Sequence, residues 1–448
     1  MFQRKLIAVF GAVALLAVAV GVSEASLSRV EGMGLTSPFL SQFTDDYANI
    51  FTYPTSVVRQ NNLVLAELGT NSDGQVDPVD FSDQSFTLIK NFPSFGAIAF
   101  QMKQGALNTL NQSTPGFLGL TTNSIRNSLN NEQLDMIWGK GFEKLDLAVR
   151  LDVTSSSLET TGIAGAGVTT KTQGADFVNP FTPYPFGTFL PDAIIANGVE
   201  MNTWGVTPSI ALHMSNDNRV EGALTFRRYS LDRSSTAVTP NQSWKDDGNL
   251  SYAVLIRGIL NSANNATWYP AIWYVNDDLG YTVNNVAPTA VKVDETYKNY
   301  GAGLSHNMRV NDNNLLIFGV AGMQSKHNYD RKDTNGAGAE IRSEEDKLTL
   351  APLFFGSLET DATHWLKVRI GASRALSNSH GDITEFDNTA VSAKLRIADF
   401  NFSLGTGIKF NNLDIDMVLN NAFPLSGGWI LSGDPETPFT RASATYHF

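Results

Sequence analysis

Apolar and polar residues alternate with a period of two along most of this chain. Between residues 144 and 154, for example, Leu145, Leu147, Val149 and Leu151 occupy alternate positions, with polar residues among those between them. Successive side chains of a β-strand point to opposite faces, so this pattern predicts strands with one apolar and one polar face. Similar alternation occupies residues 202–214, 219–231, 249–260, 267–275, 297–310, 314–329, 346–356, 362–373, 399–410 and 413–420.

The length of these stretches bears on the kind of sheet. They run for about 9–14 residues, which suits a tilted membrane crossing, whereas strands of globular sheets usually have about 5–6 residues. A secreted β-sandwich or β-helix also alternates. The length therefore favours an all-β fold, a transmembrane antiparallel β-barrel.

Short and long connections follow one another between the predicted strands. Short turns are expected at 139–141, 215–218, 261–265, 311–312 and 359–362, and long connections at 155–200, 232–248, 276–296, 330–345 and 377–389. Outer-membrane barrels have tight periplasmic turns and long external loops. This order therefore predicts an outer-membrane barrel whose last strand runs toward the periplasm.

The number of strands depends on two segments. Thirteen alternating stretches lie between residue 133 and the end of the chain, and residues 62–103 add one to three more. Within residues 390–410 the apolar positions shift by one at Ala398 and Asp399, which predicts a turn or a β-bulge there. The pattern thus allows about 14 or 16 strands, since such barrels have an even number.

The final strand ends on an aromatic residue. Ala442, Ala444, Tyr446 and Phe448 share one face, and Arg441 lies on the other. This ending resembles the C-terminal strand of Gram-negative outer-membrane barrels, whose terminal Phe and preceding aromatic residue form an insertion signal. The resemblance implies recognition of Phe448 and Tyr446 by the barrel-assembly machinery.

The N-terminus has the features of an export signal. Arg4 and Lys5 precede an apolar run over residues 6–22, and Ser23 and Ala25 supply small residues for signal peptidase. A membrane anchor of this length is the alternative. We predict a cleaved signal peptide over residues 1–25. We expect the exported chain to be located in the outer membrane of a Gram-negative bacterium.

Composition excludes several classes of protein. Apolar residues make up 42% of the chain and the mean hydropathy is −0.12, values typical of a water-soluble protein; in a barrel, however, only alternate residues face lipid. The formal charge of −12 argues against nucleic-acid binding, which needs clustered Lys and Arg. Without cysteine, the chain cannot form disulfides or thiolate metal sites.

The polar residues suggest no reaction centre. The six histidines show no paired spacing of the kind that binds metal, and no nucleophile elbow or phosphate-binding glycine loop occurs. We therefore expect neither an enzyme nor a cofactor or metal site.

Residues 26–60 lack alternation and carry glycines and paired acidic residues. Arg29 is followed by Gly32, Met33 and Gly34. Farther along, Asp45 and Asp46 precede Ala48, and Pro54 stands shortly before the first predicted strand.

This arrangement resembles the mature N-terminus of the FadL-like outer-membrane transporters of long-chain fatty acids and other hydrophobic compounds. The family pattern is roughly R-x-x-G-M-G-G, then D-D-A, then N-P-A. Here Leu35 replaces the third glycine, and Tyr53 and Thr55 flank Pro54 in place of Asn and Ala. The resemblance implies that residues 26–60 form a plug or hatch inside a barrel made by residues 61–448, and it favours about 14 strands. A periplasmic extension is the alternative.

One predicted external loop is rich in aromatic residues. Residues 175–199 carry a cluster of large apolar side chains: Phe177, Phe181, Tyr184, Phe186, Phe189 and Ile194. An exposed apolar patch of this kind usually marks a binding site. In the family, external loops form a groove that first captures ligand, and the resemblance implies that role here. The alternative is a loop that packs over the barrel mouth.

Charged side chains lie on the faces that oppose the apolar ones. Those expected to face the lumen are Arg150, Arg257, Lys367, Arg369, Asp414, Asp416 and Arg441. Mixed charge of this kind indicates a wet lumen, or a wall paired with a plug.

Together these patterns predict an outer-membrane barrel for passive uptake of a hydrophobic or amphipathic small molecule, with outer-membrane lipid as its surroundings. A porin for polar solutes and a structural or secretion-associated subunit remain open as alternatives. Fold alone does not choose among them.

Overall fold

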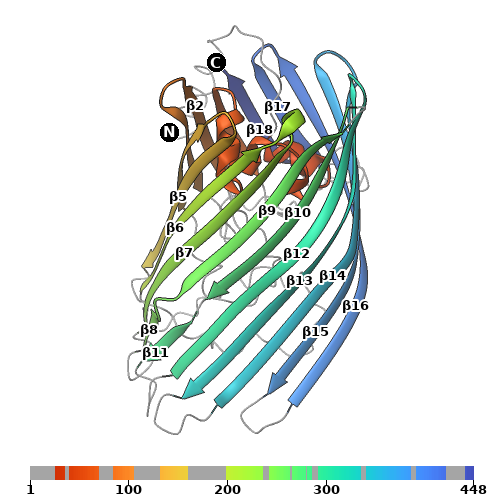
Figure 1. Ribbon diagram of the computed structural model, residues 1–448. Helices are drawn as coiled ribbons and strands as arrows, with labels where there is room; N and C mark the ends of the chain where they lie inside the picture. The colour runs from red at the N-terminus through yellow and green to blue at the C-terminus, as the bar shows by residue number, and fades with distance from the viewer. Residues whose placement is uncertain are drawn as a thin grey trace, which may run out of the picture.

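The alternating stretches pair edge to edge into one closed antiparallel sheet in the computed structural model of the chain (Figure 1). The structure describes residues 26–35, 40–69, 84–104, 132–159, 198–235, 242–262, 265–278, 280–284, 291–333, 340–384, 390–419 and 439–448. The predicted signal peptide and the aromatic residues of the predicted capture loop lie outside these ranges.

The wall begins with the following strands in chain order: β1 (Leu63–Gly69), β2 (Gln84–Phe92), β3 (Gly96–Gln104), β4 (Glu132–Gly141), β5 (Leu145–Glu159), β6 (Gly198–His213), β7 (Arg219–Ser235), β8 (Gln242–Asp246) and β9 (Leu250–Ser262). It continues through β10 (Ala266–Asp278), β11 (Tyr281–Asn284), β12 (Val291–Asn311), β13 (Asn314–Asp333), β14 (Glu340–Asp361), β15 (Leu366–Thr384), β16 (Ala390–Phe410), β17 (Leu413–Leu419) and β18 (Phe439–His447). A short 3-10 helix, η6 (Ser215–Asp217), forms the turn between β6 and β7.

The last strand closes the barrel against the first. β18 pairs with β1 from Leu63 opposite His447 to Gly69 opposite Arg441. Arg441 is buried toward the interior, whereas Phe448 is exposed on the outer face beside Lys90. The alternation expected for this strand is therefore present.

The all-β barrel class is confirmed, and the barrel has 16 strands, which is one of the two numbers that the pattern allowed and two more than the preferred 14. The difference arises in residues 62–103, which form three strands, β1, β2 and β3. The short strands β8 and β11 add no further strands to the count of 16. They lie beyond the ends of β9 and β10, between β7 and β12, and pair with each other there.

The prediction of a turn or bulge at Ala398 and Asp399 is wrong. β16 pairs with β15 without interruption from Leu366 opposite Ile408 to Thr384 opposite Ala390. Phe400 and Phe402 face outward and are 67% and 43% exposed, whereas Ile397 lies opposite the inward-facing Ser377. The apolar positions change face because the strand leaves the lipid there: inside the membrane the outer side is apolar, and beyond it the outer side is polar.

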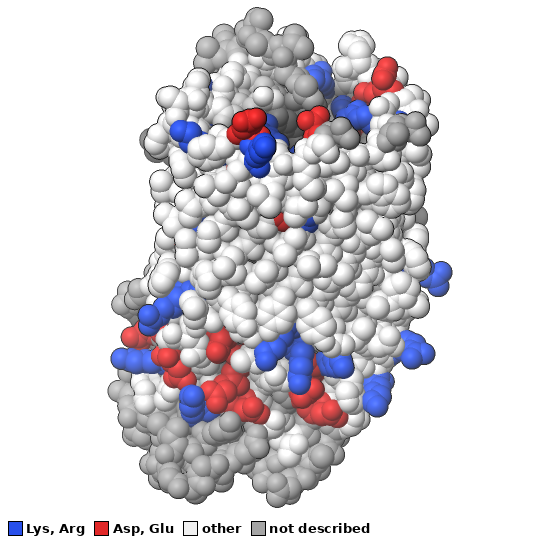
Figure 2. Space-filling model, in the orientation of Figure 1, with Lys and Arg blue, Asp and Glu red and all other residues white. Residues whose placement is uncertain are grey.

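The outer surface has a broad band with few charges, and charged side chains gather at both of its ends (Figure 2). Trp268 faces outward near the short-turn end of β10, and Tyr274 of the same strand faces outward toward the other end, beside Tyr252 and Tyr300. Aromatic residues at both edges of an apolar band are typical of a membrane-spanning barrel.

The short turns and both ends of the described chain lie at one end of the barrel (Figure 1). Backbone hydrogen bonds join the turns around this rim, for instance from Asp361 to Asn313 and from His447 to Asn412. Because outer-membrane barrels keep short turns in the periplasm, we call this the periplasmic end.

The N-terminal segment folds inside the periplasmic half of the barrel (Figure 1). It contains α2 (Leu27–Gly32) and three 3-10 helices: η1 (Ser41–Phe43), η2 (Tyr47–Phe51) and η3 (Pro54–Arg59). Among the described residues, no helix is long and apolar enough to cross a membrane. We call residues 26–60 the plug.

Candidate functional site

Apolar side chains of the plug pack against the inner wall. Met33, Leu35, Leu40 and Phe43 are at most 2% exposed, and the Phe43 ring stacks on Phe355 of β14 with 5.2 Å between the ring centres. On the other side of the plug, Tyr47, Ile50 and Val57 pack on apolar residues of β1 to β4. The plug therefore contacts strands on opposite sides of the lumen.

Glycines let the plug backbone touch the wall directly. A Cβ atom added to Gly371 of β15 would lie 1.8 Å from the Met33 carbonyl oxygen, and one added to Gly405 of β16 would lie 2.7 Å from Gly32 Cα. Gly34 has a φ of +72°, a conformation that glycine adopts without steric cost. The Gly32, Met33 and Gly34 sequence thus fits a seat made by two wall glycines.

A first buried ion cluster surrounds Glu221 of β7. Its carboxylate accepts from Arg257 Nε at 2.7 Å, from Arg219 Nε at 2.9 Å and from Arg59 of the plug. Arg257 also donates to the Thr44 carbonyl of the plug at 3.0 Å. Two wall arginines, one plug arginine and a wall carboxylate therefore bind plug and wall together.

Asp45 of the plug joins the same cluster. Arg219 Nη2 lies 2.5 Å from its carboxylate, and Arg257 Nη2 lies 3.7 Å away. The guanidinium of Arg257 also lies over the Tyr53 ring at 4.5 Å. Charge-assisted hydrogen bonds of this kind are stronger than those between neutral groups.

A second buried ion cluster surrounds Glu359 of β14. Arg29 of the plug donates to both of its oxygens, at 2.7 and 2.9 Å, and Arg369 of β15 donates at 2.6 Å. Arg369 also pairs with Asp416 of β17 at 2.7 Å, and the Asp46 carboxylate lies 3.3 Å from Arg29. Three carboxyl groups thus share two guanidinium groups.

Two further polar contacts hold the plug elsewhere on the wall. Arg150 of β5 pairs with Asp135 at 2.6 Å and donates to the Phe51 carbonyl at 2.6 Å. Arg441 of β18 donates to Glu31 at 2.8 Å. Losing one partner of a buried pair leaves an uncompensated charge and is strongly destabilising, so these contacts resist displacement of the plug.

The adjacent carboxyl groups of Asp45 and Asp46 have opposite pKa shifts. Burial raises the pKa of Asp46 well above its usual value, and Arg29 only partly offsets that effect. Burial also acts to raise the pKa of Asp45, but Arg219, Arg59 and Arg257 outweigh it and hold the pKa below the usual value. Protonation of Asp46 leaves the second cluster with two carboxylates, Glu359 and Asp416, for its two guanidinium groups.

Asp46→Asn should therefore leave the plug at least as stable as in the parent protein at neutral pH. Because the folded pKa is raised, the contribution of Asp46 is complete below its unfolded pKa of about 3.9 and is lost as pH rises toward the folded pKa. In the parent protein the Ala48 amide donates a hydrogen bond to the Asp46 carboxylate at 3.2 Å, and the side-chain oxygen of asparagine can accept the same bond. Hydrogen exchange of the plug amides, corrected for intrinsic rates between about pH 5 and pH 8, should show a flatter pH dependence.

Asp45→Asn is the matched control for that experiment. It removes a carboxylate whose lowered pKa stabilises the folded state above about pH 4, so protection should fall at neutral pH. A loss of protection for Asp46→Asn that is equally large at every pH would contradict the raised pKa.

Beyond the plug, toward the long-loop end, one patch of the inner wall is apolar. Leu255 of β9, Trp273 and Val275 of β10 and Met323 of β13 are buried in one cluster with Tyr53 of the plug, and Leu350 of β14 packs at its border. Farther round, Leu395 and Ile397 of β16 face inward. The inner wall beyond the plug also carries polar groups, among them Asp152 and Arg227, which lie 3.0 Å apart, and Glu295 and His327, which lie 3.2 Å apart.

The residues predicted to face the lumen all point inward. Arg150, Arg257, Arg369 and Arg441 contact the plug or its counter-charges. The remaining three contact other side chains: Lys367 lies 3.4 Å from Asp361, Asp414 lies 3.3 Å from His447, and Asp416 accepts from Ser26 at 2.9 Å.

The plug residues singled out in the sequence lie inside the barrel, and Pro54 begins η3. Sequence reasoning missed the wall glycines Gly371 and Gly405, as well as the counter-charges Glu221 and Glu359. Glu221 stands in the predicted strand 219–231, where an isolated charge on the inward face was the available signal, whereas Glu359 stands in the predicted short turn 359–362 and gave no such signal.

The fold and its inner segment together define a membrane-spanning β-barrel of the outer-membrane type that carries its own N-terminus as a plug. The chain matches no protein-family model and no curated protein. Among solved structures it is similar to a Pseudomonas aeruginosa FadL homologue, at 12% identity over 96% of this chain and 100% of that chain, with a TM-score of 0.42.

Two other solved structures show comparable likeness. The Ralstonia pickettii toluene transporter TbuX matches at 11% identity over 90% of this chain and 94% of that chain, with a TM-score of 0.37. The ferric-catecholate import receptor Fiu from E. coli K12 matches at 9% identity over 87% and 82%, with a TM-score of 0.34. A FadL homologue is thus among the structures that this chain resembles, as the N-terminal motif led us to expect.

Proposed function

We propose that the protein admits hydrophobic or amphipathic small molecules passively across the outer membrane. The observation that carries this proposal is the apolar inner wall of Leu255, Trp273, Met323 and Leu350, which lies directly beyond the plug. A predominantly apolar pocket with a few polar groups is the usual form of a small-molecule site. A molecule that entered from the long-loop end would reach this surface before it reached the plug.

The plug argues for a gated path. Its backbone rests on Gly371 and Gly405, and its charges pair with those of the wall, so polar groups that would otherwise attract water and ions are already bound. In this proposal ligand binding shifts the segment around Gly32 and Gly34, which opens a path past the seat. Residues 175–199 would collect ligand outside; their aromatic side chains lie outside the described ranges.

A polar-solute porin is the second candidate. An inward-facing group farther toward the long-loop end supports it: His327 of β13 lies 3.2 Å from Glu295 and stacks on Tyr297 with ring centres 4.1 Å apart. Such a porin would conduct ions with the plug in place. A structural or secretion-associated role would show neither conductance nor uptake.

Leu350→Glu should reduce uptake of an apolar solute by about tenfold, because a buried carboxylate costs several kcal/mol unless it finds a partner. The measurement is entry of fluorescent dodecanoate into proteoliposomes that contain the purified protein. Thr349→Glu is the matched control, since it places the same charge on the neighbouring residue of β14, whose side chain faces outward. Equal uptake by both variants and the parent protein would reject an apolar path along this wall.

A further inference from the structure

Five basic side chains form a row across the outer face of the barrel. Successive strand pairs place Lys298 opposite Lys326, Lys326 opposite Lys347, Lys347 opposite His380, and His380 opposite Lys394. Like charges directly opposite one another destabilise a sheet. A row of this kind therefore calls for a counter-charge.

Only part of that counter-charge comes from neighbouring carboxylates. Lys326 lies 2.9 Å from Glu345, and His380 lies 2.9 Å from Asp382. Within the described part of the chain, no ion pair joins Lys298, Lys347 or Lys394 to a carboxylate. Three lysines of the row thus remain available to an external anion.

The row lies where the apolar outer surface ends. Figure 2 shows Lys and Arg side chains along the lower border of the uncharged band, with Asp and Glu beyond them. Glu345 and Asp382 belong to the next row outward, opposite each other on β14 and β15. These carboxylates repel a polyanion that arrives from solvent, so the lysines are best reached from the membrane side.

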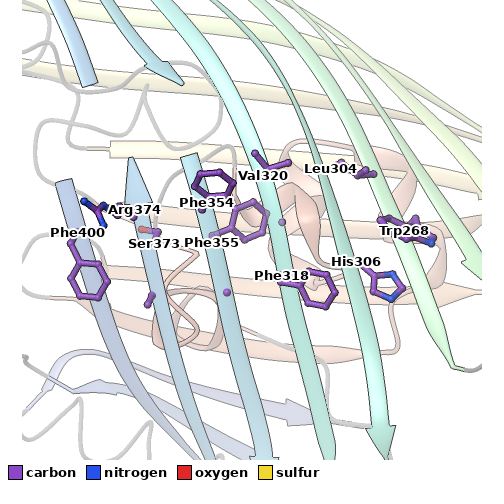
Figure 3. Close-up of a pocket in the computed structure, with 13 residues that line it drawn as sticks. Trp268, Leu304, His306, Phe318, Val320, Phe354, Phe355, Ser373, Arg374 and Phe400 are labelled. Carbon is purple, nitrogen blue, oxygen red and sulfur yellow. The ribbon is translucent and has the colours of Figure 1, made fainter. Parts of the chain in front are cut away.

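A groove opens on the same outer face, within the apolar band. It has a volume of about 530 Å³, and Phe318, Val320, Phe354 and Phe400 line it, with Gly356 as part of its floor (Figure 3). An outward-facing glycine and the neighbouring Ala372 create the hollow because they present little or no side chain. Its surface is mostly apolar and suits an acyl chain.

The spacing of groove and row fits one lipid leaflet. On β13, Val320 of the groove and Lys326 of the row are six residues apart, which corresponds to about 20 Å along the strand and roughly 15 Å along the membrane normal at a tilt of about 45°. Half of the hydrocarbon core measures about 15 Å. Arg374, between Phe354 and Phe400 on neighbouring strands, adds a cation to the groove itself.

We propose that this face of the barrel binds a phosphate-bearing anionic lipid of the outer leaflet, with an acyl chain in the groove and its phosphates on the lysine row. The site is separate from the lumen and independent of what passes through it. A bound lipid of this kind relieves the repulsion between the lysines of the row. It also holds strands β12 to β16 at a fixed orientation relative to the membrane.

Native mass spectrometry of the full-length protein, titrated with bisphosphorylated lipid A, tests the proposal. The variant Lys298→Gln/Lys347→Gln/Lys394→Gln should bind this lipid on the order of a hundredfold more weakly, because each basic residue near a membrane surface contributes about 1 kcal/mol. The matched control is Lys90→Gln/Lys140→Gln/Lys144→Gln, which removes equal charge from the periplasmic end and should bind as the parent protein does. Equal weakening in both variants, or none in the first, overturns the proposal.

A third variant separates lipid from phosphate. Gly356→Leu fills the groove, where an added Cβ atom meets only the Ile317 carbonyl oxygen at 3.7 Å, and it leaves every lysine in place. Lipid A binding should weaken by about tenfold, which corresponds to the loss of one or two buried methylene groups of contact. If lipid A binding is unchanged and inorganic phosphate displaces it fully, the row binds phosphate alone and the proposed lipid site is wrong.

Discussion

Removal of residues 26–59 should turn the barrel into an open pore. In planar lipid bilayers the shortened protein should show steady single-channel conductance at least about tenfold above that of the intact protein, because 16-stranded barrels without a plug leave an aqueous channel. The wall residues that remain keep several of their pairs: Arg257 with Glu221 at 2.7 Å, and Arg369 with Asp416 at 2.7 Å. Water in the emptied lumen would solvate the charges that the plug now binds.

Adding back the missing segment supplies the control for this measurement. A synthetic peptide of residues 26–60 should lower the conductance of the shortened barrel, and the same peptide with Arg29 replaced by Gln should do so less well. High ionic conductance of the intact protein would favour the polar-solute porin. Absence of conductance from both proteins would favour a role other than transport.

Gly371→Ala should loosen the plug without changing the barrel. The added Cβ atom would overlap the Met33 carbonyl oxygen and the Gly34 amide nitrogen, and both neighbours are backbone atoms that cannot rotate away. Overpacking of this kind costs about 1–3 kcal/mol, which corresponds to roughly a ten- to hundredfold increase in the population of the open state. Proteolysis of the plug in the folded, detergent-solubilised protein should accelerate by that factor.

Gly356→Ala is the matched control, one strand away on β14. Its new Cβ atom points outward, where the nearest heavy atom is the Ile317 carbonyl oxygen at 3.7 Å, so the plug should be cleaved at the rate of the parent protein. Identical rates for Gly371→Ala and Gly356→Ala would mean that the glycine seat does not hold the plug. Transient current openings in the Gly371→Ala protein alone would link the seat to gating.

The two-faced pattern predicted the wall well because the lipid imposes it. A residue on the outer face of the band must be apolar, so each crossing leaves a period of two in the sequence. The same rule misled the interpretation of residues 390–410. There the strand continues past the edge of the lipid, and the change of apolar face at Ala398 reflects a change of surroundings and not a break in β16.

The seat of the plug was only half predictable. Arg150, Arg257 and Arg369 could be placed on inward faces, but their partners depend on register: Arg257 pairs with Glu221 because β7 and β9 are neighbours that place the two residues opposite each other. Which wall glycines would meet the plug depends on the path of a segment that has no alternation. A sequence pattern encodes neither the partners of these arginines nor the wall glycines that contact the plug, so both were identified only from the structure.

The excess length of β14 places the barrel mouth far from the lipid. This strand has 22 residues, and residues 340–346 lie beyond the lysine row at the edge of the apolar band. That part of the strand rises about 16 Å above the hydrocarbon at about 3.3 Å per residue and a tilt of about 45°. The barrel wall therefore extends above the headgroup layer. Under the proposed function, a molecule that enters at this mouth starts its passage outside the hydrocarbon, above the level of the headgroups.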